Sequence, residues 1–402
     1  MNKILESFAI ILALVWQADG TEPSKLCIGS CVGEEEKVCT FNFSIDIFAS
    51  DTGYFRVQGC DGVNPTLGIE YNVTYIFDQS NATNWYHPIG LAYGPDGVYG
   101  NNVELGKEDS NPVTNIDCAP NCDSPEYMSD GEPMCKEDCD VNFGLDDYEP
   151  AFALDRDTWL SEPGYSLSVR ITDPGTTEFF YFCHIHNYMS GRIKVLDASK
   201  EMKNAQDVVP IPYEYKVPSE FDEGCGTFNV SAYSDANSQC PDMTFVCGKN
   251  PNAYHQCLIA VDCAMHVEMK TTSLQDPTVT FMHQMIAHHK NAVNMAKLLL
   301  KLNPKSIKCG TVYDGRRLQE DDCIIDGKDT DNTPVITMLW SIINGQNHQI
   351  TFMESWLRDN KAPAFDYCGP ELQADAPSDS SIVHSSVTVI IAALISSFNF
   401  RF

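Results

Sequence analysis

The chain has 402 residues, of which 43% are hydrophobic and 20% are charged. This length is enough for two or three domains, each with a core of its own. The 56 acidic residues outnumber the 26 basic ones and give a net charge of −30. Such a surface repels nucleic acids and anionic membranes, argues against phosphate binding, and attracts cations or basic partners.

The first twenty residues have the features of a secretory signal peptide. Lys3 precedes an apolar run over residues 4–16, which only Glu6 interrupts, and Ala18-Asp19-Gly20 offers small residues for cleavage. We therefore predict that residues 1–20 are a signal peptide and that the protein is secreted. Asn-x-Ser/Thr sequons fit passage through a eukaryotic secretory pathway, and they begin at Asn42, Asn72, Asn81 and Asn229.

The chain has 17 cysteines. In a secreted protein most cysteines form disulfides, because the compartment is oxidising. An odd number leaves one cysteine unpaired. If Cys183 is that residue, the other sixteen (17 − 1) can form eight disulfides. The alternative is that Cys183 is itself half of a disulfide.

The N-terminal half shows the pattern of short β-strands. Residues 41–48 read Phe-Asn-Phe-Ser-Ile-Asp-Ile-Phe, and such alternation is typical of a strand with one buried face. Glycine, proline and asparagine separate further candidate strands, at residues 54–57, 68–77, 88–93, 165–171, 178–182 and 192–196. We predict an all-β sandwich over residues 27–198.

An acidic, cysteine-rich insertion interrupts this pattern at residues 111–149. Its four cysteines are Cys118, Cys122, Cys135 and Cys139. Zinc binding is one interpretation, but secretion favours disulfides that close a surface loop. The acidic residues could bind calcium or a basic partner, although none of them has the spacing of an EF-hand loop.

The loop between two of these candidate strands carries three potential metal ligands. Cys183, His186 and Met189 follow one another at i, i+3 and i+6, so a thiolate, an imidazole and a thioether can meet at one point. His87, which follows an upstream candidate strand, can supply a second imidazole. Two histidines, a cysteine and a weak axial methionine suit copper that cycles between two oxidation states. We assign no metal role to His184.

This loop, Cys-x-x-His-x-x-Met followed by x-Gly-x-Ile, resembles the cupredoxins, or blue-copper proteins, with the short amicyanin-type loop. The resemblance implies a Greek-key sandwich and a type 1 copper site with His87, Cys183, His186 and Met189 as ligands. Multicopper oxidases also carry a Cys-His-Ile run, but their trinuclear centre needs several His-x-His pairs. This chain has one such pair, His184-Ile185-His186.

Residues 199–255 differ from the sandwich and are rich in proline and cysteine. We interpret them as a linker. Beyond it, the apolar spacing predicts helices over residues 260–270 and 278–302. Met265, His266 and Met269 lie in the first helix.

Met285, His288 and His289 lie within adjacent turns of the second helix. Thioethers with imidazoles favour Cu(I) over zinc, calcium or magnesium, so both groups are candidate copper sites. The alternative is that methionines at helical spacing pack in a core. We expect that role for Met295 and Met353.

The order of histidine and methionine over residues 260–360 resembles the secreted helical family called domain of unknown function 305. The resemblance implies a ferritin-like helical bundle over residues 256–368 that binds copper through these side chains. The chain departs from the family at Gln349, where a glutamate is usual. It also departs in an insertion at residues 303–333, which contains Cys309 and Cys323.

The C-terminal residues 374–402 combine small residues, a polar spacer and an apolar stretch at residues 387–400. This stretch is shorter than the ~20 residues that a membrane-spanning helix needs. The pattern indicates a GPI-attachment signal. A weak transmembrane anchor and a plain hydrophobic tail are the alternatives.

Taken together, the patterns predict a membrane-anchored copper protein of the cell surface, with an all-β cupredoxin-like sandwich followed by an all-α ferritin-like bundle. We expect electron transfer, or copper binding, storage or delivery. The redox or copper-transfer partner is not identified by the sequence, and a basic partner would suit the acidic surface. A carrier is favoured over an enzyme. One alternative is a metal oxidoreductase that relays electrons to copper on the helices. Another is a structural or adhesion protein with a vestigial metal site.

Overall fold

The computed structural model describes residues 26–33, 36–106, 123–134, 143–162, 164–248, 251–272, 276–302 and 334–364, and the backbone at 110–111 and 116–117. The predicted signal peptide (1–20), much of the acidic insertion, the insertion at 303–333 and the predicted anchor (374–402) lie outside these residues. None of the helices within them is both long and apolar enough to cross a membrane.

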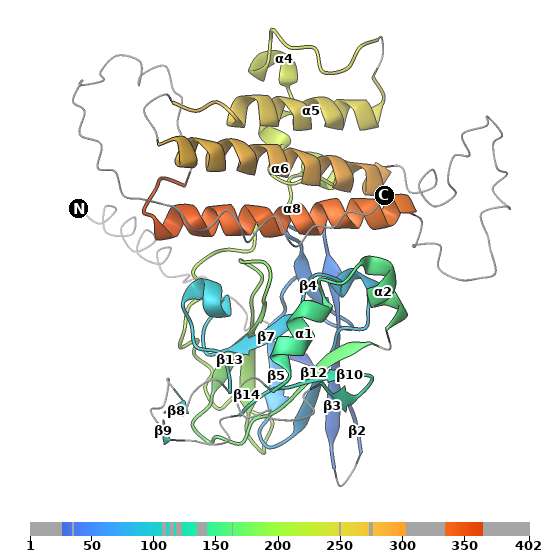
Figure 1. Ribbon diagram of the computed structural model, residues 1–402. Helices are drawn as coiled ribbons and strands as arrows, with labels where there is room; N and C mark the ends of the chain where they lie inside the picture. Colours follow the sequence, from blue (N-terminus) through green and yellow to red (C-terminus); the bar gives the residue numbers. More distant parts are fainter. Residues whose placement is uncertain are drawn as a thin grey trace, which may run out of the picture.

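Two β-sheets form the N-terminal half (Figure 1). The strands of the first sheet are, in spatial order, β1 (Cys27–Ile28), β5 (Leu67–Glu70), β14 (Gly191–Leu196), β13 (Glu178–Cys183) and β7 (Ile89–Ala92). Those of the second are β11 (Glu132–Pro133), β10 (Glu126–Ser129), β12 (Tyr165–Arg170), β6 (Thr74–Asp78), β3 (Val38–Asp46) and β2 (Ser30–Val32), with β4 (Tyr54–Val57) paired to β3. Both sheets are mixed, because β5 runs parallel to β14 and β3 runs parallel to β6. The pair β8 (Ser110–Asn111) and β9 (Ile116–Asp117) is separate.

The predicted strands are confirmed except the one at residues 68–77, which is wrong, because β5 and β6 divide this stretch between the two sheets and residues 71–73 belong to neither. The burial of the strands follows the sequence pattern. In β3 every second residue is buried. Phe41 packs on Tyr75 of the neighbouring β6, and Phe43 packs on Tyr181 of β13 in the other sheet. Strand β13 differs, because all of its residues are buried. A strand covered on both faces needs a continuous apolar run, and Phe179-Phe180-Tyr181-Phe182 provides one.

Three long helices form the C-terminal region, α5 (Ala253–Glu268), α6 (Pro277–Leu302) and α8 (Pro334–Asp359). They lie side by side in one layer, with α8 closest to the sandwich (Figure 1). The two predicted helices are confirmed, although α5 begins earlier than expected. Asn252 sets this start, because its side chain accepts a hydrogen bond from the backbone of His255 at 3.0 Å.

One face of the helical layer shares a hydrophobic core with the sandwich, whereas other helix residues form separate clusters. Ile336, Leu339, Trp340 and Ile343 of α8 belong to the same buried cluster as the sandwich residues. Polar contacts add to this packing at the turn after β3, where the Lys297 ammonium and the Asn347 side-chain amide donate to main-chain carbonyls. The two halves of the chain therefore pack as one body.

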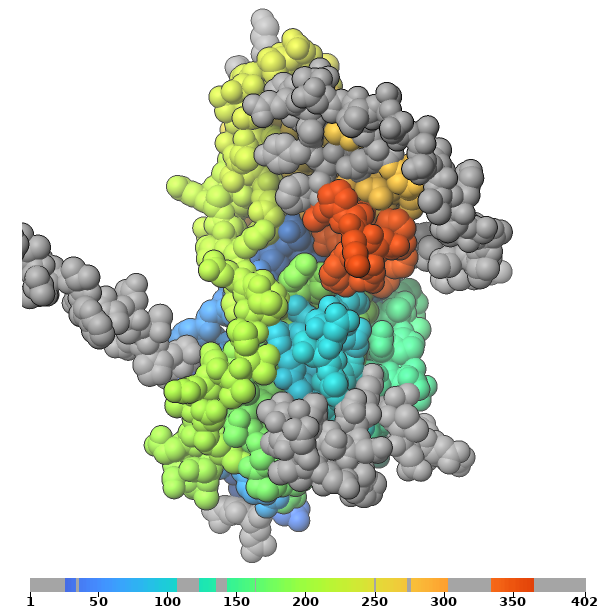
Figure 2. Space-filling model, turned by 90° about the vertical axis from the view of Figure 1, so that its left-hand side faces the viewer, coloured from blue at the N-terminus to red at the C-terminus, as the bar shows by residue number. Residues whose placement is uncertain are grey.

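The linker was predicted at residues 199–255, but it ends earlier, because α5 begins at Ala253. Residues 199–248 of this segment lie against the rest of the protein. They run along one side from the sandwich to the helices (Figure 2). Near the sandwich, buried Glu178 accepts from Arg192 Nη1 and from the amides of Val208 and Val209 at 2.8 to 2.9 Å. Further along come three short helices, α3 (Glu220–Cys225), η3 (Ser231–Tyr233) and α4 (Ala236–Gln239).

Four disulfides are formed among the described cysteines. They join Cys27 to Cys60, Cys31 to Cys39, Cys225 to Cys257 and Cys240 to Cys263. The last two tie the segment before the helices to α5. Cys183 is unpaired and buried, as predicted, but Cys247 is also unpaired and exposed, so the expectation that every other cysteine pairs is wrong at Cys247. Four disulfides indicate an extracellular protein.

Candidate metal centre

The side chains of His87, Cys183 and His186 meet inside the protein. Their ligand atoms all lie within 4.8 Å of one another. The thiol Sγ is 3.8 Å from Nδ1 of His87 and 3.7 Å from Nδ1 of His186. All three side chains are at most 1% exposed. In the part of the chain that the structure describes, no other three His, Cys, Asp or Glu side chains converge in this way.

Strand pairing explains why His87 reaches this point. Cys183 is the last residue of β13, and it pairs with Ile89, the first residue of β7. His87 lies two residues before Ile89, so the antiparallel register carries its ring past the end of β13. The sequence associated His87 with an upstream strand, but the structure shows that it leads into β7.

Met189 is fully buried at the end of the same loop. A carboxylate holds its backbone in place, because Asp96 Oδ1 accepts from the Met189 amide at 3.2 Å. The same oxygen accepts from the Ser190 and Tyr213 hydroxyls, each at 2.9 Å. Asp96 therefore ties the ligand loop both to the turn after β7 and to the segment after the sandwich.

Tyr99 holds the middle of the loop. It lies in the short helix η2 (Gly97–Gly100). Its hydroxyl lies 2.9 Å from the carbonyl oxygens of both His184 and Ile185. The ligand loop is therefore held at its centre and at its end by two residues of one turn, Asp96 and Tyr99.

We predict that Gly97→Ala disrupts this turn and destabilises the protein by about 3 kcal/mol. Gly97 has a φ of +47°, and an added Cβ would lie 2.1 Å from a ring carbon of Phe182, the neighbour of Cys183. Left-handed strain and overpacking each cost about 1–3 kcal/mol. Denaturant unfolding measures the loss. Gly59→Ala is the control, because Gly59 has a φ of +81° with no atom within 4 Å of the added Cβ, so only about 1 kcal/mol is expected. Equal losses in the two variants would refute the clash.

Burial sets the protonation of all three donors. It lowers the pKa of His87 to about 3 and the pKa of His186 well below its ordinary value, so both imidazoles are neutral at pH 7. Burial also raises the pKa of Cys183 to about 12. Without a metal the cysteine is therefore a thiol, and a metal that binds it must displace a proton.

The donors fit copper. A buried cysteine stays unpaired in this disulfide-containing protein, between two neutral imidazoles and near a buried thioether. Copper prefers soft donors of these kinds. Zinc sites more often hold several thiolates or histidines with carboxylates. His184, to which the sequence assigned no metal role, instead packs on Phe182 with ring centroids 4.7 Å apart.

Helix α8 covers the centre. The main-chain oxygen of Asn344 is 3.4 Å from Nε2 of His186, and the Asn344 side-chain amide donates to the carbonyl of Trp85 at 3.0 Å. His348, one turn further along α8, is exposed, and its ring centroid lies 6.4 Å from that of Tyr86. The centre is thus closed on the side that faces the helices.

The second candidate group lies on α6. His289 is buried, and its ring nitrogens are 2.7 Å from the Met285 carbonyl and 2.6 Å from Oε1 of Gln349. Gln349, the departure noted in the sequence, is therefore a direct partner of His289. His288 is exposed and Met285 half-buried. Metal binding by these residues stays a prediction.

The first candidate group lies at the end of α5. Met265 and His266 are half-buried in its last turn, and Met269 follows as the C-cap. His266 lies beside Phe245, with ring centroids 6.4 Å apart. Among the described contacts, none joins these three side chains to one another. Their metal role also stays a prediction. Of the core methionines, Met353 is buried as expected, whereas Met295 is 38% exposed and that expectation is wrong.

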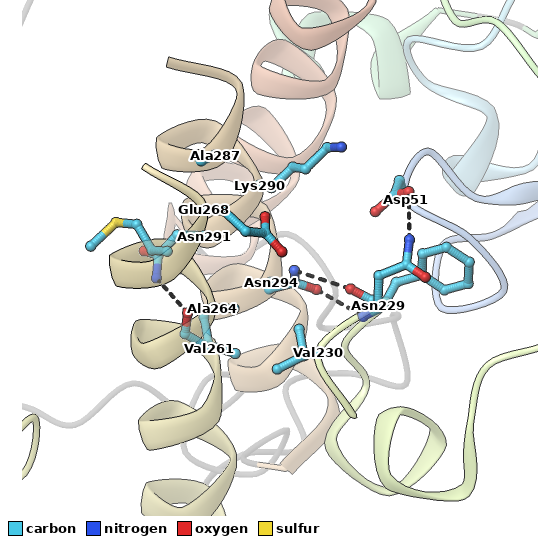
Figure 3. A pocket seen from close by; sticks show the side chains of 12 residues that line it. Asp51, Asn229, Val230, Val261, Ala264, Glu268, Ala287, Lys290, Asn291 and Asn294 are labelled. Carbon is cyan, nitrogen blue, oxygen red and sulfur yellow. Dashed lines mark hydrogen bonds between the residues drawn. The ribbon is translucent and has the colours of Figure 1, made fainter. Parts of the chain in front are cut away.

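Met265 also lines a pocket of about 130 Å³ between α5, α6 and the sandwich (Figure 3). Two carboxylates, Asp51 and Glu268, line it together with Lys290. Both carboxylates raise the pKa of Lys290 against the lowering by burial. The ammonium therefore balances the negative charge of these carboxylates, which would otherwise attract a cation.

Comparison with known proteins gives no relative from which a function could be transferred. No protein-family model, curated protein or solved structure matches the chain. The assignment of the site consequently rests on its own geometry and chemistry.

Sequence reasoning missed Asp96, Tyr99 and Asn344, which surround the centre. Asp96 and Tyr99 stand in a Gly-Pro-Asp-Gly-Val-Tyr turn that reads as an ordinary connection. Asn344 is one polar residue in a helix 158 positions from His186. Only the packing of α8 on the sandwich brings it to the site.

Proposed function

We propose that this protein binds one copper ion at His87, Cys183, His186 and Met189 and works as a one-electron carrier. The observation that carries the proposal is the unpaired, fully buried Cys183, with an imidazole nitrogen within 3.8 Å on each side. When bound, copper supplies a redox couple that accepts and returns a single electron.

The protein residues supply a fixed and dry coordination site. The Nδ1 atoms of His87 and His186 would bind the ion, and the Cys183 sulfur would connect it to β13. Met189 would complete the set of donors, and Asp96 holds the Met189 backbone at 3.2 Å. A site held rigid by its surroundings changes little in geometry when its charge changes, and this favours rapid electron exchange.

Closure by α8 supports electron transfer over copper delivery. A delivery site must exchange its ion with a partner, whereas these ligands lie at most 1% exposed beneath a helix. An electron needs only a short path to the surface. His348 is the exposed ring next to Tyr86, which in turn lies 6.4 Å from His186 between ring centroids.

The partner and the cellular location belong to the same proposal. The net charge of −30 favours a basic or cationic redox partner. The four disulfides and the sequence features of residues 1–20 and 374–402 support a secreted protein anchored at the cell surface. Copper on the His and Met residues of the helices would be a second, separate store.

The test is a titration of the purified ectodomain, residues 21–374, with Cu(II) and with Zn(II). We expect an intense visible absorption band that saturates at one copper per chain, because a thiolate bound to Cu(II) gives a strong charge-transfer transition. Ascorbate should bleach the band, and ferricyanide should restore it. Zn(II) should give no colour and should compete for the site.

Either of two results would overturn the proposal. One is copper binding without an intense visible band, which would place the ion away from Cys183. The other is a band that ascorbate bleaches but no oxidant restores, which would mean that the thiol is consumed rather than cycled. A metal count beyond one copper with an unchanged band would point to additional ions on the helices.

A further inference from the structure

Asn344 of α8 lies close to the imidazoles of the candidate metal centre. It is 0% exposed and lies at the face of the helix that packs on the sandwich. Its main-chain oxygen lies 3.4 Å from Nε2 of His186, and its side chain raises the pKa of His87 against the larger lowering by burial. The two contacts come from different atoms, so they can be argued and tested separately.

The contact with His186 fixes the position of one proton. A main-chain carbonyl oxygen can only accept a hydrogen bond. At 3.4 Å from the Asn344 oxygen, Nε2 of His186 must therefore be the nitrogen that carries hydrogen. Nδ1 is then the bare nitrogen, and it is the one that faces the Cys183 sulfur at 3.7 Å.

The contact with His87 follows from what the Asn344 amide can offer. The amide nitrogen donates to the Trp85 carbonyl at 3.0 Å, and this assigns the nitrogen and the oxygen of the side chain. Its Oδ1 and Nε2 of His87 are both buried, and neither has a hydrogen-bond partner at ordinary distance among the described residues. Each of these two atoms is therefore available as a partner for the other. The side chain of Asn344 also acts as a hydrogen-bond partner that raises the pKa of His87, against the larger lowering by burial.

We propose that Asn344 is a positioning residue that holds His87 and His186 as Nε2–H tautomers, with both Nδ1 atoms turned toward Cys183. The helical region then completes the metal centre of the sandwich. The inference rests on the proposed copper function for its purpose, but not for its test, because tautomers exist without metal. Outer partners of this kind change metal affinity by about 10–100-fold.

The proposal gives α8 a direct influence on the centre. When α8 docks, it supplies both acceptors in one step, since they belong to one residue. A partner that displaced α8 would remove both at once. Loading of the site and docking of the helix are therefore coupled, and by linkage each favours the other.

The test compares imidazole ¹⁵N chemical shifts in the metal-free ectodomain of the wild type and of Asn344→Ala. These shifts separate the protonated from the bare ring nitrogen. In the wild type we expect Nε2–H at both His87 and His186. The variant removes Oδ1 and keeps the main-chain oxygen, so His87 should become a mixture of tautomers while His186 stays unchanged. His186 is thus a control within the same molecule.

Asn347→Ala is the matched control variant. Asn347 lies one turn along the same face, is 1% exposed, and donates to the Asp51 carbonyl at 2.8 Å. It loses a comparable buried amide but touches neither imidazole. We expect Cu(II) affinity to fall about tenfold in Asn344→Ala and to stay within twofold in Asn347→Ala. Asn344→Leu, which fills the same space without an acceptor, should repeat the tautomer change if the alanine variant unfolds.

The outcomes separate this inference from the copper proposal. An unchanged His87 tautomer in both Asn344 variants would overturn the role of Asn344, whatever copper does. Equal changes in the Asn344 and Asn347 variants would also overturn it, because the effect would then come from loosened docking. The expected tautomers without a visible copper band would uphold Asn344 as the positioning residue and defeat the copper function.

Discussion

Cys183→Ser is expected to abolish the visible band and to weaken Cu(II) binding by more than ~100-fold. The band requires a thiolate sulfur, and a serine oxygen does not replace it as a soft ligand. Loss of a ligand costs more than loss of an outer partner, which is already worth about 10–100-fold. Absorption spectra and a competition titration with a chelator of known affinity measure both effects.

The fold of this variant should survive. The backbone amides of Ile185 and His186 interact with the Cys183 sulfur, and they can donate to a serine oxygen in its place. The hydroxyl is therefore not left unpaired, and we expect a change of only about 1 kcal/mol in the free energy of unfolding of the metal-free protein.

Cys247→Ser is the matched control, because Cys247 is the other unpaired cysteine that the structure describes and it is exposed. It should retain the band and the affinity of the wild type. A band that disappears in the Cys247 variant and persists in the Cys183 variant would show that copper binds at the surface thiol.

Lys297→Met is expected to change the pH dependence of stability. Lys297 is 0% exposed, and its Nζ donates to the carbonyls of Ser50 and Asp51 at 2.7 and 2.8 Å. Burial lowers its pKa from 10.5 to about 8, although Asp51 and Asp46 raise it. The positive charge in turn lowers the pKa values of His87 and His186.

The sign follows from the two pKa values of Lys297. Between pH 8 and 10.5 the unfolded chain holds the proton more strongly than the folded protein does. The free energy of unfolding contributed by Lys297 therefore rises with pH across this window and is lost as pH falls through 8. From pH 7 to pH 10 the wild type should gain about 2.5 kcal/mol relative to Lys297→Met.

Urea unfolding of both proteins at several pH values checks this prediction. The difference between them isolates Lys297, because the remaining titrating groups are shared. A difference that is flat across the window would mean that the ammonium is solvated in the folded state. At pH 7 the variant leaves the Ser50 carbonyl without its hydrogen-bond donor, which costs about 1–3 kcal/mol of stability. It also no longer buries a charge, which is stabilising. The absolute difference there should accordingly be small.

Local patterns in the sequence were enough for the elements. The alternation of residues 41–48 and the apolar run at 178–183 predict β3 and β13. A strand buried on one face alternates apolar and polar residues, and a strand buried on both faces is continuously apolar. The Cys-x-x-His-x-x-Met spacing likewise predicts three of the four donors, since one short loop carries them. His87 was found only by its chemistry and its position near a strand.

Long-range pairing decided everything else about the site. The register of β13 on β7 places His87 beside Cys183, and no local pattern encodes a register between strands 90 residues apart in sequence. The helices were expected as a separate unit with its own metal chemistry. In the structure some of their buried residues join the core of the sandwich, and others form clusters of their own.

The sequence by itself therefore determined the strands, the helices and the ligand types, because each depends on residues close together in the chain. Only the tertiary structure decided that His87, Cys183 and His186 converge and are buried, and that Asn344 of α8 lies against them. It also decided that Asp96 binds the Met189 backbone and that Lys297 joins α6 to the turn after β3. These depend on which surfaces bury one another. A single polar residue in a helix carries no mark of the partner that it meets.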